Sequence, residues 1–322
     1  MFFSQRKAQK WVKKTIKKNL STQTPINSDN FIHPTDHAAL EALKKIPLFD
    51  TLCNKLLKIL GELNYSIENK ATHIQITEQQ LPEIHQMVKS ICVKLNIEMP
   101  ELYLKLDRDP NAYTFGSDKH FIVIHSGLLE CLEADELYAV LAHECGHIAC
   151  KHVLYHTVGR LILNGGSYGL SKIDTLLNST LIGSLLKETA MTSLELAYHH
   201  WNRCSELSAD RVAVLCCEDA DPVIESMMRL AGGVASIPYE VNRDLFLQQA
   251  IEYKDKVDHK KSAKILEFLK TGRNTHPLLA VRAYEAKEFY HSEKYTSYFH
   301  PKAIASESIN TPESLPKPVS ET

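Results

Sequence analysis

The sequence has no long hydrophobic run, no C-x-x-C pair and no excess of either charge. No stretch reaches the roughly 18 uninterrupted apolar residues of a membrane-spanning helix, because Asn, Gly or Ser interrupts both of the most apolar segments, 161–170 and 176–186. The N-terminus is basic but lacks the apolar core of a signal peptide. We therefore expect a cytoplasmic chain that stays in the compartment where it is made.

The cysteine pattern and the charge balance each exclude a class of protein. Without a C-x-x-C pair, the eight cysteines cannot form a zinc site of the C-x-x-C…C-x-x-C type, and their spacing does not favour a secreted disulfide framework. We predict reduced, mostly buried thiols. The 37 basic and 39 acidic side chains leave a formal charge of -2, which excludes bulk electrostatic binding of nucleic acid.

Composition divides the chain into four parts. Residues 1–20 carry no acidic residue and repeat apolar residues every fourth position, which is typical of a basic amphipathic helix. Such a helix can lie on an anionic membrane surface, although a solvated tail or a segment packed on the body would show the same pattern. Residues 21–30 are predicted to be a linker, 31–300 a single domain, and 301–322 a disordered tail rich in Pro, Ser and Thr.

Periodicity within the domain predicts a small sheet beside many helices. Residues 72–77 alternate like a strand, and three short runs with strand character follow between residues 101 and 125. From about 126 to 217 the pattern is almost wholly helical, and further helices follow to about 290. We therefore predict an α+β, mostly helical fold.

The stretch LAHECGHIACKH, residues 141–152, contains the residue types of a metal site. It lies in a segment with helical periodicity and no proline, so His143 and His147, four apart, share one face and can bind one ion. Glu144 projects beside that face, where its carboxylate can reach a water molecule without being a ligand. The alternative is a core helix that carries several histidines.

A catalytic zinc needs a third protein ligand as well as a position for water. The pattern H-E-x-x-H-x-x-G-x-x-H fails here, because Cys150 and Val153 stand at its Gly and third His positions. His152 comes one residue early and has no Gly to turn the chain, so we expect it to be exposed or to contact a ligand instead of the metal. A later helix supplies another candidate: Glu206 and Asp210 are four apart, with Asp210 placed to hydrogen-bond a ligand histidine. A surface pair of acidic residues is the alternative.

Five motifs, taken in order, resemble those of one enzyme family: NAYTFG, IVIHSGLLECL, DELYAVLAHECGHIACKH, RCSELSAD and THPLLAVR. They resemble the HtpX-like and CAAX-prenyl-endopeptidase-like gluzincin metallopeptidases over about residues 31–290. The segment HPTDHAALEALKKIPLFDTL resembles the soluble branch, which has no transmembrane helices. The resemblance implies a zincin-like fold with one zinc ion per chain, ligated by His143, His147 and Glu206, and Glu144 as the general base.

The same resemblance implies roles for five further residues. Asp210 would hydrogen-bond a ligand, and Asn111 with Ala112 would lie on an edge strand above the cleft. His276 and Arg282 match a T-H-P-x-x-x-x-R segment near the active site, where a cation can stabilise the oxyanion. For His276, a loop histidine that caps a helix is the alternative.

We therefore predict a zinc endopeptidase that acts on protein or peptide substrates. Without transmembrane helices, soluble or peripheral substrates are expected before prenylated or lipid-embedded ones. A second hypothesis is a membrane-surface or partner-binding protein with a structural zinc, which residues 1–20 motivate but which would not need Glu144. A zinc hydrolase of another amide is a third. The oligomeric state is left open.

Overall fold

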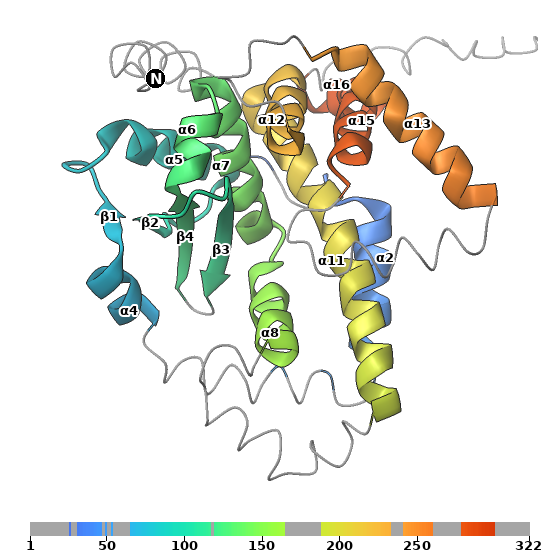
Figure 1. Cartoon of the computed structure of the whole chain (residues 1–322), viewed down its shortest axis with the longest axis horizontal. Coiled ribbons are helices and arrows are strands. Elements are labelled where there is room, and N and C mark those ends of the chain that lie inside the picture. Colours follow the sequence, from blue (N-terminus) through green and yellow to red (C-terminus); the bar gives the residue numbers. More distant parts are fainter. Residues whose placement is uncertain are drawn as a thin grey trace, which may run out of the picture.

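A computed structural model describes parts of the chain between residues 26 and 299. Within these parts a small sheet lies beside a larger set of helices, so the predicted α+β, mostly helical fold is confirmed (Figure 1). The predicted segments 1–20 and 301–322 lie outside the described residues, as does the predicted linker apart from Ile26. The described residues are 26, 31–46, 49, 53, 65–116, 119–164, 188–232, 241–259 and 278–299.

The sheet is mixed, with strand order β1-β2-β4-β3. Strand β2 is parallel to β4, whereas β1 pairs with β2 and β3 pairs with β4 in antiparallel fashion. Each strand falls within a run for which the sequence predicted strand character, and β3 lies at an edge of the described sheet. The strands are β1 (Ile74–Ile76), β2 (Glu101–Lys105), β3 (Ala112–Gly116) and β4 (His120–His125).

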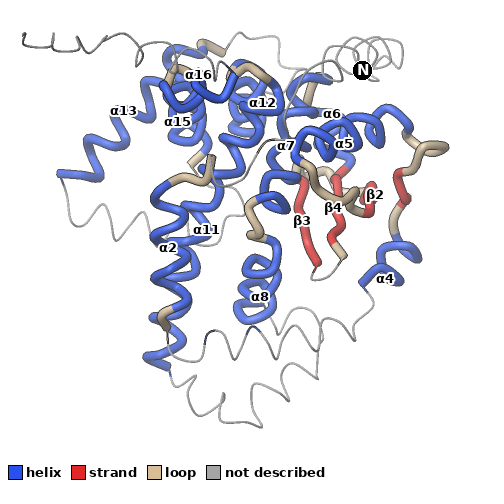
Figure 2. Tube along the Cα trace, turned by 180° about the vertical axis from the view of Figure 1, so that it is seen from behind, coloured by secondary structure: helices blue, strands red, loops and turns tan. Residues whose placement is uncertain are grey.

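Helix α7 lies between the sheet and the long helix α11, and α2 runs beside α11 (Figures 1 and 2). None of the helices in the described ranges is long and apolar enough to cross a membrane. They are α2 (Pro34–Lys44), α4 (Tyr65–Thr72), α5 (Pro82–Leu95), α6 (Ser126–Cys131), α7 (Ala134–Ala149), α8 (Val153–Asn164), α11 (Glu188–Cys217), α12 (Asp221–Ala231), α13 (Arg243–His259), α15 (Leu279–Tyr290) and α16 (Glu293–Phe299).

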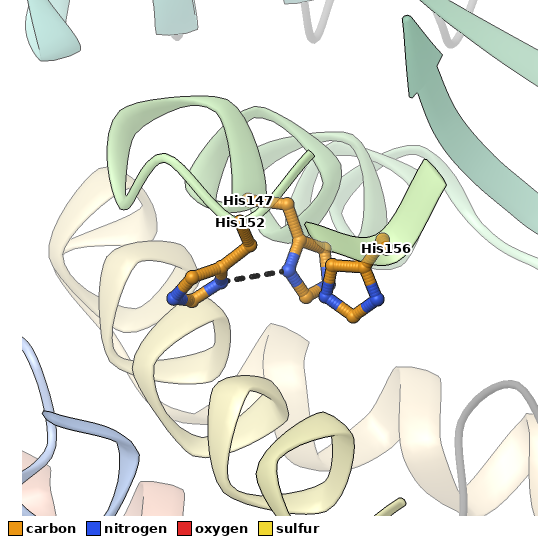
Figure 3. A group of neighbouring side chains, drawn as sticks. All are labelled: His147, His152 and His156. Carbon is orange, nitrogen blue, oxygen red and sulfur yellow. Dashed lines mark hydrogen bonds between the residues drawn. The ribbon is translucent and has the colours of Figure 1, made fainter. Parts of the chain in front are cut away.

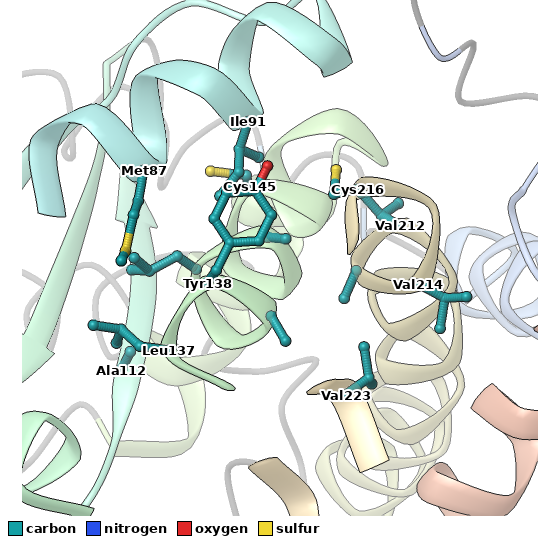
Figure 4. Close-up of a cluster of buried hydrophobic side chains, with 14 of the residues drawn as sticks. Met87, Ile91, Ala112, Leu137, Tyr138, Cys145, Val212, Val214, Cys216 and Val223 are labelled. Carbon is teal, nitrogen blue, oxygen red and sulfur yellow. The ribbon is translucent and has the colours of Figure 1, made fainter. Parts of the chain in front are cut away.

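The core forms around α7. The helix begins with a capping box, in which Glu133 and Glu136 each accept a hydrogen bond from the backbone N–H of the other. Side chains from α5, α7, α11 and β3 meet in the interior, with Tyr138 and Cys145 among them (Figure 4). All eight cysteines are free and seven are buried, as the sequence predicted.

Helices α7 and α11 approach each other closely at Gly146. A Cβ atom at this position would lie 3.1 Å from both the Cα of Ala209 and the Cβ of Val212. Because interiors are packed at crystal-like density, the missing side chain at Gly146 sets the distance between the two helices. That distance places the acidic side chains of α11 beside the histidines of α7.

We predict that a side chain larger than that of alanine at position 146 destabilises the protein. Gly146→Ala gains about 1 kcal/mol of helix propensity, which offsets its tight contact with α11. The side chain introduced by Gly146→Val is too large for the space between α7 and α11, and it should lower the free energy of unfolding by about 1–3 kcal/mol. Urea unfolding of the metal-free protein measures both values, and a Val variant as stable as the wild type would contradict the close packing.

Candidate active site

Three buried side chains from two helices converge at the centre of the molecule. His143 and His147 come from α7 and Glu206 from α11, and each is at most 6 % exposed. The two Nε2 atoms are 3.1 Å apart, His143 Nε2 lies 3.5 Å from Glu206 Oε2, and His147 Nε2 lies 3.4 Å from Glu206 Oε1. A tetrahedral zinc with bonds of about 2.0–2.1 Å separates its donor atoms by roughly 3.3 Å. These residues therefore fit a zinc ion.

Asp210 and Arg282 lie behind His143. Oδ1 of Asp210 is 2.9 Å from His143 Nδ1, one helical turn beyond Glu206 as the sequence spacing predicts. The guanidinium of Arg282, from α15, donates to both oxygens of Asp210, from Nε at 2.8 Å and from Nη2 at 2.6 Å. Its Nη1 lies 2.8 Å from Glu206 Oε2. A single arginine thus compensates two buried carboxylates.

The protonation of this cluster follows from burial and from these contacts. Burial lowers the pKa of His143, but hydrogen bonds to Asp210 and Glu206 outweigh burial and raise it to about 9. Burial, together with the charge of His143, lowers the pKa of His147 to about 4 despite its contact with Glu206. Burial also works against the ionised form of Asp210, yet Arg282 and His143 hold its pKa below the ordinary value. These contacts favour the ionised carboxylate of Asp210 beside Arg282 and a proton on His143 in the metal-free protein.

A cavity of about 410 Å³ opens beside these residues. Its apolar wall comes from α7, α12 and neighbouring elements, and includes Val140, Val223 and Met227. His147 and Glu206 do not line it. His276 lies outside the described residues. The predicted site residues that do line the cavity are Asn111, Ala112, His143, Glu144, Asp210 and Arg282.

Two further side chains contact the predicted residues, and the sequence reasoning had not considered the first of them. Thr114 of β3 donates its hydroxyl to Glu144 Oε2 at 2.6 Å. Its strand alternates, so Thr114 shares the buried face with Ala112, and this period-2 pattern could have revealed it. His152 is 1 % exposed, so the alternative of an exposed residue is wrong, and its Nδ1 lies 3.1 Å from Nδ1 of His147, one of the predicted ligands.

The fold and the site together define a class of protein, the zincin-like metallopeptidases. Their features here are an H-E-x-x-H helix packed on a small sheet and a glutamate from a later helix. A family model described as Peptidase family M48 matches residues 78–289. The chain belongs to this family, and the resemblance to HtpX-like peptidases is confirmed.

Curated relatives support the same assignment. The chain is 35 % identical over 274 residues to the plastoglobule-localized metallopeptidase 48 of Arabidopsis thaliana, covering 84 % of this chain and 75 % of that protein. It is 27 % identical over 176 residues to a protease HtpX homolog of Paenarthrobacter aurescens, covering 51 % of this chain and 59 % of the relative. No solved structure matches.

We predict that Arg282→Met destabilises the metal-free protein by about 3–5 kcal/mol, because it leaves buried carboxylates without their cation. The matched control is Arg243→Met, which removes a partly exposed ion pair with Asp221 and should cost less than about 1 kcal/mol. Urea unfolding gives both free energies. Equal losses in the two variants would contradict a larger contribution of the buried Arg282 pairing to the free energy of unfolding.

Proposed function

We propose that the protein is a zinc-dependent endopeptidase in which Glu144 is the general base. The observation that carries the proposal is the geometry of His143, His147 and Glu206, whose donor atoms have the spacing of a tetrahedral zinc site. Membership in Peptidase family M48 supports the peptidase activity.

In this proposal one zinc ion would be held by His143, His147 and Glu206. When bound, zinc supplies a Lewis acid for the scissile carbonyl and for water. Glu144 accepts a proton from the attacking water and passes it to the leaving amine. Thr114 orients the carboxylate of Glu144 through its 2.6 Å hydrogen bond, and Asp210 orients the ring of His143.

We propose that an extended substrate pairs with the edge strand β3. Asn111 and Ala112 line the cavity at the start of this strand. At its other end, the hydroxyl of Thr157 from α8 interacts with both the N–H and the C=O of Gly116. The substrate backbone is therefore placed along the first residues of β3. Main-chain pairing reads the peptide backbone, which favours protein or peptide substrates of broad sequence.

For Arg282 the contacts favour a positioning role over the oxyanion role that the resemblance implied. Its guanidinium is directed at Asp210 and Glu206, and binding these carboxylates fixes the ligand set. The oxyanion role of His276 stays a prediction.

The alternative of a partner-binding protein with a structural zinc is not favoured, since the family is one of peptidases and Glu144 lines the cavity. Membrane contact through residues 1–20 stays a prediction. So does the cytoplasmic location, and the name of the Arabidopsis relative places that protein at plastoglobules in the chloroplast.

We predict that Glu144→Gln retains zinc but loses hydrolysis by about 10²–10⁴-fold, because the amide cannot accept the proton from water. Zinc content by elemental analysis and cleavage of a quenched-peptide library are measured on the same preparations. Glu206→Ala is the companion variant and should lose zinc. Unchanged cleavage by Glu144→Gln, or full zinc in Glu206→Ala, would remove that residue from its proposed role.

We predict that Thr114→Val lowers kcat by about 10–100-fold, since a hydrogen bond to a charged group contributes about 1.5–3 kcal/mol. Thr114→Ser keeps the hydroxyl and should retain most of the activity. Zinc content should be the same in both variants, because Thr114 contacts the base and none of the proposed ligands. Equal activities of Val and Ser would contradict the role of the hydroxyl.

A further inference from the structure

The proposed function leaves one buried polar cluster unused, next to the ligand His147. His152 lies in the turn after α7, and its Nδ1 is 3.1 Å from Nδ1 of His147 (Figure 3). Its Nε2 is 2.9 Å from Oδ2 of Asp36, a residue of the N-terminal helix α2. Both His152 and Asp36 are 1 % exposed. Buried polar groups of this kind stay in a core only when they are hydrogen-bonded.

The backbone at the end of α7 places His152 beside His147. Lys151 adopts a left-handed conformation with φ of 61°. The N–H of Lys151 donates to the carbonyl of Ile148, and the N–H of His152 donates to the carbonyl of His147 at 2.9 Å. These two bonds form a Schellman motif, which returns the chain toward the helix it has just left. The imidazole of His152 is therefore directed at the ring of His147.

The proton positions in the series His147–His152–Asp36 follow from which nitrogen of His147 faces the other proposed ligands. Its Nε2 points toward His143 and Glu206, so a neutral ring that uses the Nε2 lone pair there carries its proton on Nδ1. His147 Nδ1–H then donates to Nδ1 of His152, and His152 Nε2–H donates to Asp36. Each donor in this series of hydrogen bonds faces an acceptor, and the last acceptor is the carboxylate of Asp36.

The surroundings of Asp36 favour its role as the terminal acceptor. Besides His152 it accepts hydrogen bonds from Nε1 of Trp201 at 3.1 Å and from the hydroxyl of Ser208, both on α11. Burial alone would raise the pKa of Asp36, but the hydrogen bonds from His152, Ser208 and Trp201 outweigh it and lower the pKa. An ionised Asp36 is thus held fixed by two helices.

The same histidines could instead form a second metal site, because ligand atoms of His147, His152 and His156 lie within 4.8 Å of one another. The hydrogen bonds favour the first interpretation. Both ring nitrogens of His152 already face partners, and Nε2 of His156 lies 3.2 Å from the hydroxyl of Ser205.

We propose that His152 and Asp36 are positioning residues that fix the ring of His147 and thereby strengthen zinc binding. The inference rests on the proposed function, because it takes His147 as a zinc ligand. In this arrangement each ligand histidine has its own carboxylate support: Asp210 holds His143 directly, and Asp36 holds His147 through His152. Such supports make the ring more basic and fix its orientation, and their loss typically lowers metal affinity.

Two amide substitutions at position 152 separate the positioning role from a purely structural one. In His152→Asn the amide occupies the place of Nδ1 and keeps the contact with His147. In His152→Gln the amide occupies the place of Nε2 and keeps only the contact with Asp36. Zinc affinity is measured on the full chain by competition with a chromogenic chelator, and the melting temperature of the metal-free protein is recorded for each variant.

We expect His152→Gln to bind zinc about 10–100-fold more weakly than the wild type. The Asn variant should fall clearly between the Gln variant and the wild type, even where the two variants melt at the same temperature. Met87→Ala is the control for stability, because it truncates a buried side chain of α5 that takes no part in the hydrogen bonds of His152 or Asp36. Its zinc affinity should match that of the wild type.

Three results would overturn the inference. One is equal affinity of the Asn and Gln variants, and another is a loss of zinc affinity in Met87→Ala as large as that in His152→Gln. The third is two zinc ions per wild-type chain with one lost in His152→Gln, which would establish the second metal site. Wild-type protein that binds no zinc would instead overturn the proposed function, and this inference with it.

Discussion

The compensation of two buried carboxylates on α11 is the interaction on which the rest of the site depends. Glu206 and Asp210 are at most 2 % exposed, and leaving such a buried charge without its partner would cost about 3–5 kcal/mol, a large share of a protein's stability. Arg282 binds both of them and His143 completes the pairing. Helix α15 is thereby joined to α11, and α11 to α7. Two of the three proposed ligands, His143 and Glu206, are in direct contact with the guanidinium of Arg282.

Helix α11 contributes side chains to two polar clusters, one on each of two of its faces. Toward α7 it presents Glu206 and Asp210 to the histidines, while Trp201 and Ser208 hold Asp36 of α2. A rotation of α11 about its axis would break both clusters together. The close approach at Gly146 limits such a rotation sterically, so packing and polar contacts specify one register.

Helical spacing predicted which side chains converge at the candidate site, because residues four apart share a face whatever the tertiary structure. His143 with His147 and Glu206 with Asp210 are such pairs. The four strands were predicted from alternation in residues 72–77 and from three short runs with strand character between residues 101 and 125. Asp36 could not be found like this. It meets His152 across 116 positions of the sequence, and nothing local to either residue indicates the contact. Long-range register is decided by packing, which a single sequence does not display.

His152 shows how a local rule fails at a site where tertiary contacts decide. A glycine is the usual signal for a left-handed residue after a helix, and its absence led to the expectation that the chain does not turn toward the metal. Lys151 nevertheless adopts φ of 61°, at a cost of about 1–2 kcal/mol for a residue with a Cβ. Strain of this size persists only where the surroundings over-determine the conformation. Here two backbone hydrogen bonds close the turn, and the side chain of His152 is held between His147 and Asp36. The turn is therefore specified by the contacts of the residue that follows it, and a glycine at 151 is not required.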